Sequence, residues 1–197
     1  APVGRIVYDD EHRRVRAVQL ASGETIPARC AVVAVGGKSV PRTGSTGDGY
    51  PWAEAAGHTI TELYPTEVPI TSDEPFIRSR ELQGLSLRDI ELTVWNPNGK
   101  RIITHEGDMI FTHFGLSGPA ALRCSQFVVK ALKQGAGRVL LTIDLMPERT
   151  EDEVLAMIVQ AAKREPRKAI KNVLKPLLPD RLIPLLATMA GLPPEAT

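Results

Sequence analysis

Ala31-Val32-Val33-Ala34-Val35-Gly36-Gly37 is an unbroken apolar run that ends in two glycines. Such a run, rich in β-branched residues and without alternating polar residues, is typical of a parallel strand that is covered on both faces. Open α/β sheets hold ligands at the ends of such strands, where glycine lets the backbone approach a ligand closely. The alternative is a loop that only turns the chain, because glycine is an ordinary turn residue.

Two shorter strands precede this run. Residues 3–8 and 15–20 are predicted to form a hairpin, and residues 25–35 are predicted to form a third strand that contains the apolar run. Three strands with a fully apolar member and no helix among them do not make a stable domain. We therefore expect that the sequence begins within a domain whose other layers lie elsewhere.

A segment dense in glycine, serine and threonine follows the run. It includes residues 43–49 and leads into a short helix that Gly57 is predicted to end. Free N–H groups at the start of a helix favour anionic groups such as phosphates. Lys38 and Arg42 are candidate phosphate or substrate contacts, although cations in loops are more commonly solvated.

The middle of the chain is predicted to form a small antiparallel barrel. Residues 85–95, 100–105, 108–112 and 138–145 have strand patterns, and Asn96-Pro97-Asn98-Gly99 is a turn between the first two. A helix is expected over residues 117–133, with Ser117 as its N-cap and an apolar face that contains Ala120, Cys124, Phe127, Val128 and Ala131.

The last fifty residues have a helical pattern. Thr150 and Glu153 form a capping box for a helix that ends near residue 163. Two shorter helices are predicted over residues 167–174 and 179–190, separated by prolines.

Composition excludes several classes of protein. The chain has 24 basic and 23 acidic residues, so no net field attracts nucleic acid or anionic lipid, and a nucleic-acid partner is not expected. No apolar run reaches the roughly 20 residues of a membrane span, so we expect a soluble, cytoplasmic protein without a membrane partner. Cys30 and Cys124 are expected to be buried thiols rather than a disulfide, and the cysteines and histidines form no metal-binding cluster.

Three ordered blocks of the sequence closely resemble the HI0933-like (BaiN/YhiN) flavoprotein family. They are residues 34–50, with Ala55-Ala56-Gly57-His58 and Leu63-Tyr64-Pro65 after them, then residues 82–89 and residues 107–119. The resemblance covers essentially the whole chain. It implies a piece of an FAD-dependent oxidoreductase, of α+β fold, in which part of an FAD-binding domain is followed by an inserted domain made of a small antiparallel β-barrel and a helical subdomain.

The resemblance also implies a division of the chain and a set of cofactor contacts. Residues 1–60 would belong to the FAD-binding domain and residues 61–197 to the insert, with the barrel over about 61–146 and the helical part over about 147–197. The insert would cover the flavin and shape the site for a small-molecule substrate, with NAD(P)H as an electron donor that the family allows. The implied FAD-binding residues are Val3, Ala34, Val35, Gly36, Gly37, Lys38, Gly47, Asp48 and Gly49.

The sequence also departs from the family pattern. The G-x-G-x-x-G turn that binds the pyrophosphate does not occur in it, and neither does the C-terminal segment that closes the flavin site. We therefore expect the isolated chain to hold FAD weakly or not at all, with the N- and C-terminal parts of its own FAD-binding domain as its partners. Amine oxidation and reduction of conjugated double bonds are both attached to the family, and the sequence does not choose between them.

His113 is the one candidate for a catalytic side chain, as a proton donor or substrate contact beside the flavin. A structural hydrogen bond is the more common role for a lone histidine near a helix start. Asp48 is equally well explained by hydrogen bonds within its own loop. Flavin enzymes do not require a catalytic side chain, because the cofactor carries the chemistry.

Two other hypotheses stay open. The barrel and helices could be a binding module without enzymatic activity, for RNA in particular, because small barrels often bind nucleic acids. The only basic cluster is Lys163-Arg164-Glu165-Pro166-Arg167-Lys168 with Lys171 and Lys175, which a solvated helix face explains better because no aromatic residues are interleaved. The third hypothesis is an insert that folds alone, with the first 35 residues poorly anchored or paired with another copy.

Overall fold

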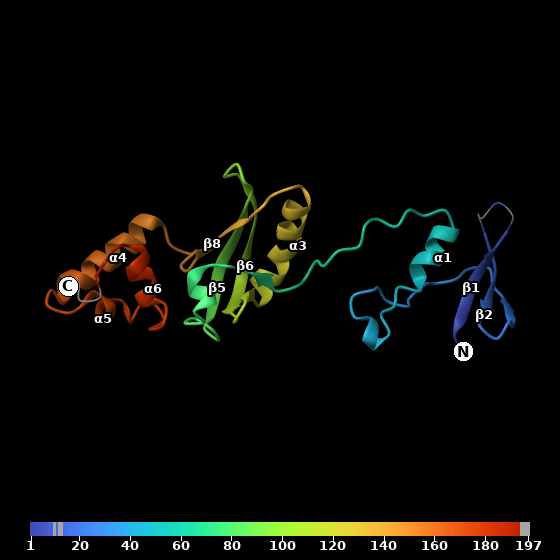
Figure 1. Cartoon of the computed structure of the whole chain (residues 1–197), viewed down its shortest axis with the longest axis horizontal. Coiled ribbons are helices and arrows are strands. Elements are labelled where there is room, and N and C mark those ends of the chain that lie inside the picture. The colour runs from blue at the N-terminus through green and yellow to red at the C-terminus, as the bar shows by residue number, and fades with distance from the viewer. Residues whose placement is uncertain (10, 12–13, 194–197) are drawn as a thin grey trace. The chain divides into compact units, whose positions relative to one another are not determined.

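The computed structural model describes residues 1–9, 11 and 14–193. These residues form two compact units, Ala1–Tyr64 and Pro65–Thr197 (Figure 1). The architecture is α+β, as the resemblance implied, with a three-stranded sheet in the first unit and a five-stranded sheet with helices in the second. Among the described residues, no helix combines the length and apolar composition needed to cross a membrane.

The first unit begins with the predicted hairpin. Strands β1 (Val3–Tyr8) and β2 (Val15–Leu20) pair antiparallel, and β3 (Thr25–Pro27) adds to the other side of β2. The turn between β2 and β3 is closed by a hydrogen bond of 3.0 Å from the Gly23 N–H to the Leu20 carbonyl oxygen. Gly23 has φ +92°, a conformation that glycine adopts without strain.

The prediction of a buried third strand over residues 25–35 is wrong beyond Pro27. Residues 28–35 form no strand, and the side chain of Val32 is 93% exposed. A parallel strand needs a neighbour on each side, and none of the described residues pairs with this run. Cys30, expected to be buried, is exposed for the same reason.

Helix α1 (Gly49–Ala55) follows the glycine-rich segment, after a 3₁₀ turn over Pro41–Thr43. The helix ends as predicted at Gly57, which has φ +87°. The Gly57 N–H donates to the Glu54 carbonyl oxygen and the His58 N–H to that of Ala53, the two bonds of a Schellman motif. The Tyr8 hydroxyl donates a 3.0 Å hydrogen bond to the Trp52 carbonyl oxygen and so ties α1 to β1.

The second unit is built on an antiparallel half-barrel with the strand order β4-β7-β6-β5-β8. Its strands are β4 (Ile70–Thr71), β5 (Ser86–Trp95), β6 (Arg101–Phe111), β7 (Gly115–Ser117) and β8 (Leu140–Asp144), with a short helix α2 (Pro75–Arg78) before β5. The apolar residues at even positions in the second half of β5, Ile90, Leu92 and Val94, are almost fully buried.

The two strands predicted over residues 100–105 and 108–112 are one strand, β6. Its pairing with β5 shifts between Leu87 and Ile90, where Arg88 and Asp89 lie opposite the single residue Asp108. The bulge lies in β5, which it bends, and β6 runs past it without ending. The Asp89 N–H, displaced from the ladder, donates to Asp108 Oδ1 at 3.2 Å.

Helix α3 (Pro119–Lys133) packs on β5 and β6 (Figure 1). Its buried residues include Ala120, Cys124, Val128 and Ala131 of the predicted apolar face. The predicted N-cap, Ser117, is wrong, because Ser117 pairs with Ile110 as the last residue of β7 and Gly118 is the N-cap. A Cβ atom at Gly118 would lie 3.0 Å from the Asp108 carbonyl oxygen, so this approach of the helix to β6 requires glycine.

Cys124 lies in the middle of this interface and is fully buried. Its thiol donates to the Leu92 carbonyl oxygen at 3.5 Å. Burial raises the pKa of the Cys124 thiol to about 11, against the opposing effect of a hydrogen bond from the backbone of His105. The predicted burial of this cysteine is confirmed, and its thiol stays protonated near neutral pH.

The C-terminal part contains α4 (Glu151–Arg164), α5 (Ile170–Leu174) and α6 (Ile183–Met189). The capping box of α4 is confirmed: the Glu153 N–H donates to Thr150 Oγ1 at 3.3 Å and the Thr150 N–H donates to Glu153 Oε2 at 2.8 Å. The bond from the Thr150 N–H, and a second one of 3.0 Å from the Thr150 hydroxyl to Glu153 Oε2, lower the pKa of the Glu153 carboxyl. The Arg181 guanidinium joins this part to the half-barrel by donating to the carbonyl oxygens of Glu81 and Gln83.

Candidate functional site

The structure brings two glycine-containing stretches of the first unit together. A Cβ atom placed on Gly47 would lie 3.0 Å from Cδ2 of Tyr50 and 3.3 Å from Cδ of Lys38. One placed on Gly37 would lie 3.3 Å from the Tyr50 hydroxyl. Gly37 and Gly47, ten residues apart, thus share the neighbour Tyr50, and Lys38 lies against Gly47. These residues form the glycine-lined loop, which we define as residues 36–38 and 47–49.

Gly49 sets how closely α1 approaches the apolar run. A Cβ atom on Gly49 would lie 2.8 Å from Cγ1 of Val33 and 3.0 Å from Cγ2 of Val35. The first distance is shorter than real Cβ contacts and the second is tighter than most of them, and valine side chains are stiff. The absence of a side chain at Gly49 therefore lets the first turn of α1 lie directly against residues 33–35.

The backbone of the apolar run is available to a partner. Within the described part of the chain, the backbone groups of residues 30–39 neither donate nor accept a hydrogen bond with another backbone group. Backbone polar groups are satisfied by water, by a neighbouring strand or by a ligand. Ala34, Val35, Gly36 and Lys38 are exposed and Gly37 is half-buried, so a partner can reach these groups.

Two predicted residues have simpler structural roles. The Thr46 hydroxyl donates a 2.9 Å hydrogen bond to Asp48 Oδ1, and the Asp48 side chain makes no capping bond to α1. The carboxylate therefore orders its own loop, the alternative that the sequence left open. Val3 lies at the start of β1, opposite Leu20 of β2. Its contact with FAD stays a prediction.

His113 lies in the second unit, in the exposed turn between β6 and β7. Its ring packs edge-on against the ring of Phe114, with 4.7 Å between the ring centroids. Among the described residues, no hydrogen-bond partner orients its imidazole, so neither the expected structural hydrogen bond nor a catalytic dyad is present. A role for His113 beside a flavin stays a prediction.

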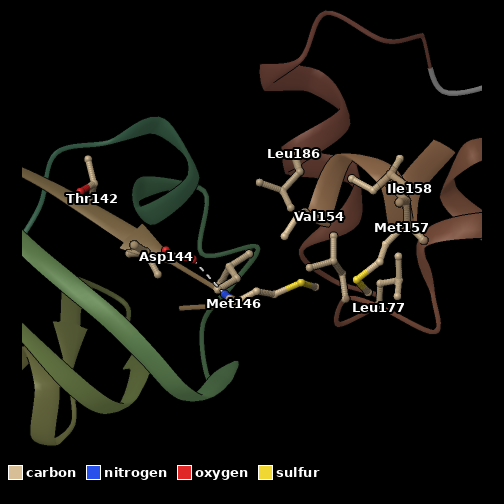
Figure 2. Close-up of a pocket in the computed structure, with 12 residues that line it drawn as sticks. Thr142, Asp144, Met146, Val154, Met157, Ile158, Leu177 and Leu186 are labelled. Carbon is tan, nitrogen blue, oxygen red and sulfur yellow. Dashed lines mark hydrogen bonds between the residues drawn. The ribbon is translucent and has the colours of Figure 1, made fainter. Parts of the chain in front are cut away.

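An apolar cavity of about 410 Å³ lies between the end of β8 and the three C-terminal helices (Figure 2). Figure 2 shows Met146 reaching from the sheet toward the helices, where Val154, Met157 and Leu177 line the cavity. A 2.9 Å hydrogen bond from the Met146 N–H to Asp144 Oδ1 fixes the turn that carries Met146. Sequence reasoning missed this cavity, although the i, i+3, i+4 spacing of Val154, Met157 and Ile158 marks one apolar face of α4.

A second, more polar hollow of about 300 Å³ lies between the end of α4 and α5. Its polar lining comes from the side chains of Gln160, Arg164, Glu165 and Asn172. The sequence did not predict this hollow or the residues that line it. Within the described residues, no group of three or more histidine, cysteine, aspartate or glutamate side chains is placed to hold a metal ion.

Comparison with known proteins identifies the family. The family model described as "HI0933-like protein barrel and H2TH domain" matches residues 64–197, more than half of the chain. The chain belongs to this family. Members of the HI0933-like family are FAD-dependent oxidoreductases, as the sequence resemblance implied.

Three curated relatives are similar to the chain. A ribosomal RNA dihydrouridine synthase of Haemophilus influenzae is 31% identical over 91% of this chain and 40% of its own length, and one of Escherichia coli is 28% identical over 87% and 39%. A 3-dehydro-bile acid delta(4,6)-reductase of Clostridium scindens is 26% identical over 86% of this chain and 40% of its own length. The chain thus spans about 40% of the length of these HI0933-like relatives.

Proposed function

We propose that the protein carrying this chain is an FAD-dependent reductase of conjugated carbon–carbon double bonds. The observation that carries the proposal is the shared chemistry in the relatives' names. One name describes a reductase acting at delta(4,6) double bonds, and the other describes formation of dihydrouridine, which is uridine with two added hydrogens. Of the two chemistries that the sequence left open, this shared chemistry favours reduction over amine oxidation.

The glycine-lined loop and the apolar run fit a role in holding FAD. Glycine at positions 36, 37 and 47 keeps side chains away from the backbone, and the backbone groups of residues 34–38 are free to bond a ligand. Lys38 adds a cation that suits the cofactor's phosphates. When bound, the flavin supplies the hydride chemistry, and NAD(P)H is the proposed source of its electrons. The residues of this chain bind and orient the cofactor.

The exposed apolar run has a second proposed role. Val32, Val33 and Val35 are exposed at 93%, 46% and 43%. We infer that strands from the remainder of the flavin-binding domain pair with residues 31–35 and cover these side chains, as the run's unalternating pattern predicts. The greater length of the relatives supports this inference, because most of each relative lies outside the matched region. The half-barrel and helices would then cover the substrate side.

The proposed substrate is the uracil base of a uridine in RNA, on the basis of the two relatives named as ribosomal RNA dihydrouridine synthases. A steroid is the second candidate, because the third relative acts on a bile acid. The apolar cavity of about 410 Å³ favours this second candidate, since cavities of such size and lining hold small apolar ligands.

A single-turnover experiment tests the proposal. The full-length protein, loaded with FAD and reduced by NADPH without oxygen, is mixed with a ribosomal RNA transcript or with a 3-oxo-delta(4,6) steroid. We expect the visible band of the oxidised flavin to return with the transcript, because the uracil double bond accepts the hydride. Return of the band with the steroid alone would favour the second candidate.

The control is a transcript in which every uridine is replaced by dihydrouridine, which has no double bond to reduce. This transcript must leave the flavin reduced. If the band returns with neither substrate, or equally with the control transcript, the protein is not a reductase of these double bonds.

A further inference from the structure

One stretch of the second unit carries a local excess of positive charge. Residues 163–175, which we call the basic segment, contain six lysine or arginine residues and a single carboxylate, Glu165. The whole chain is almost neutral, with 24 basic and 23 acidic residues. The basic segment runs from the last two residues of α4 to the residue after α5. The near neutrality that argued against nucleic acid thus hides a local excess of positive charge.

Most of these cations have no carboxylate partner among the residues that the structure describes. Lys168 Nζ lies 2.8 Å from Glu165 Oε2, and Lys175 Nζ lies 3.5 Å from Asp180 Oδ2. No other ion pair within the described residues involves the basic segment. The four cations left without one are exposed; they are Lys163, Arg164, Arg167 and Lys171. Exposed cations without a partner carboxylate are free to neutralise phosphates.

The polar hollow adjoins these cations. Arg164 lines the hollow together with Glu165 and the amide side chains of Gln160 and Asn172. Its volume of about 300 Å³ is at the lower end of the range of about 300–1,000 Å³ that small-ligand pockets occupy. Amide groups donate and accept hydrogen bonds, as the edges of nucleotide bases do. Unpaired cations beside a hollow with such groups are a combination that suits a nucleotide chain.

We propose that the basic segment binds the phosphate backbone of the substrate RNA and that the hollow receives one of its nucleotides. This inference rests on the proposed function, and it assigns to α4 and α5 the surface that holds the RNA. It departs from the expectation that nucleic acid is not a partner, because that expectation used the charge of the whole chain. Arginine suits this role, since its planar guanidinium bonds two phosphate oxygens at once.

An anionic membrane is the other surface that a basic segment can contact. Peripheral helices add large apolar side chains that enter the lipid beside their cations. The exposed large apolar side chains of the described chain include none within the basic segment, and those nearest before it, Leu155 and Val159, lie earlier on α4. The cations of the basic segment therefore have no exposed large apolar side chain among them, which favours RNA.

The test compares two triple variants of the full-length protein. The first is Arg164→Gln, Arg167→Gln and Lys171→Gln. The second removes the same charge from the exposed residues of β5, β6 and their turn, as Arg88→Gln, Lys100→Gln and Arg101→Gln. Binding of a fluorescein-labelled ribosomal RNA hairpin is measured by anisotropy over a range of salt concentrations. Circular dichroism checks that both variants are folded, as expected for exposed positions.

We expect the first variant to bind the hairpin about 100-fold more weakly near about 0.1 M salt. Each lost phosphate contact lowers the slope of log affinity against log salt concentration by about 0.7. Its slope should fall by about 2, while the second variant stays within about twofold of the wild type. Equal losses in both variants, or no loss in the first, would overturn the proposal. So would wild-type binding to phosphatidylserine–phosphatidylcholine vesicles without binding to the hairpin.

The flavin assay separates this inference from the proposed function. If the wild type reduces uridine in RNA while the first variant binds RNA normally, the basic segment is not the RNA-binding surface and the proposed function stands. If the first variant loses RNA binding but RNA never reoxidises the flavin of the wild type, the surface stands and the function is wrong.

Discussion

Replacing Gly49 by alanine is expected to weaken FAD binding by the full-length protein at least about tenfold, or about 1.4 kcal/mol. The added Cβ atom would lie 2.8 Å from Val33 and 3.0 Å from Val35, so the apolar run must move away from α1. Residues 34–38 carry the backbone groups proposed to contact the cofactor, and they move with it. Titration of the apoprotein with FAD, followed by flavin fluorescence, measures the change.

Helix propensity alone predicts that Gly49→Ala stabilises α1, and so predicts no loss of FAD affinity. Gly49 is the first residue of α1, and alanine is favoured over glycine in helices by up to about 1 kcal/mol. The matched control adds Val33→Ala and Val35→Ala, which remove the methyl groups that the new Cβ atom meets. Recovery of FAD affinity in this triple variant would assign the loss to the collision. Unchanged affinity in Gly49→Ala itself would show that the contact is unimportant.

Replacing Gly115 by alanine is expected to destabilise the second unit by about 3–5 kcal/mol, which combines backbone strain with overpacking. Gly115 has φ +156°, and a Cβ atom there would overlap the carbonyl oxygen of Ile70. This is the point where β7 pairs with β4, at the edge of the half-barrel. Urea unfolding, followed by the fluorescence of Trp95 in β5, measures the loss.

Gly107→Ala is the matched control for this prediction. Gly107 has a similar φ of +147°, but a Cβ atom there would meet its nearest neighbour at an ordinary 3.8 Å. This variant should lose only about 1–2 kcal/mol, the strain alone. Equal losses in the two variants would show that the approach of β4 to β7 is not as tight as described.

Local sequence patterns predicted the elements that depend on local interactions. The hairpin of β1 and β2 has the predicted bounds, and Thr150 and Glu153 make the expected reciprocal bonds at the start of α4. The stop of α1 at Gly57 is confirmed in the same way. Each of these features is decided within one short stretch of the chain, so the sequence contains the information needed to place it.

The wrong predictions fall where residues far apart in the sequence decide the local structure. Residues 28–35 have the composition of a central strand, but a strand forms only where another strand pairs with it. Ser117 has the composition of an N-cap, but the close packing of Gly118 on β6 places Ser117 in β7. Two strands were predicted where β6 runs without a break past the bulge that Arg88 and Asp89 form in β5.

The candidate site was predicted residue by residue but not as an arrangement. The resemblance named Lys38, Gly47 and Gly49, whereas the contacts of Lys38 with Gly47 and of Val33 with Gly49 come from the folded chain. The basic segment was visible in the sequence. Which of its cations are left without a carboxylate, and that Arg164 lines a hollow, depends on side-chain positions that the sequence does not contain.

The most direct test of the central claim is a comparison of FAD retention. The full-length protein and the chain of residues 1–197 are each incubated with FAD, and their visible absorbance is measured after gel filtration. We predict that the flavin band elutes with the full-length protein and is weak or absent with residues 1–197, because this chain supplies only the glycine-lined loop and the apolar run. A full-length protein that elutes without the flavin band would contradict the account.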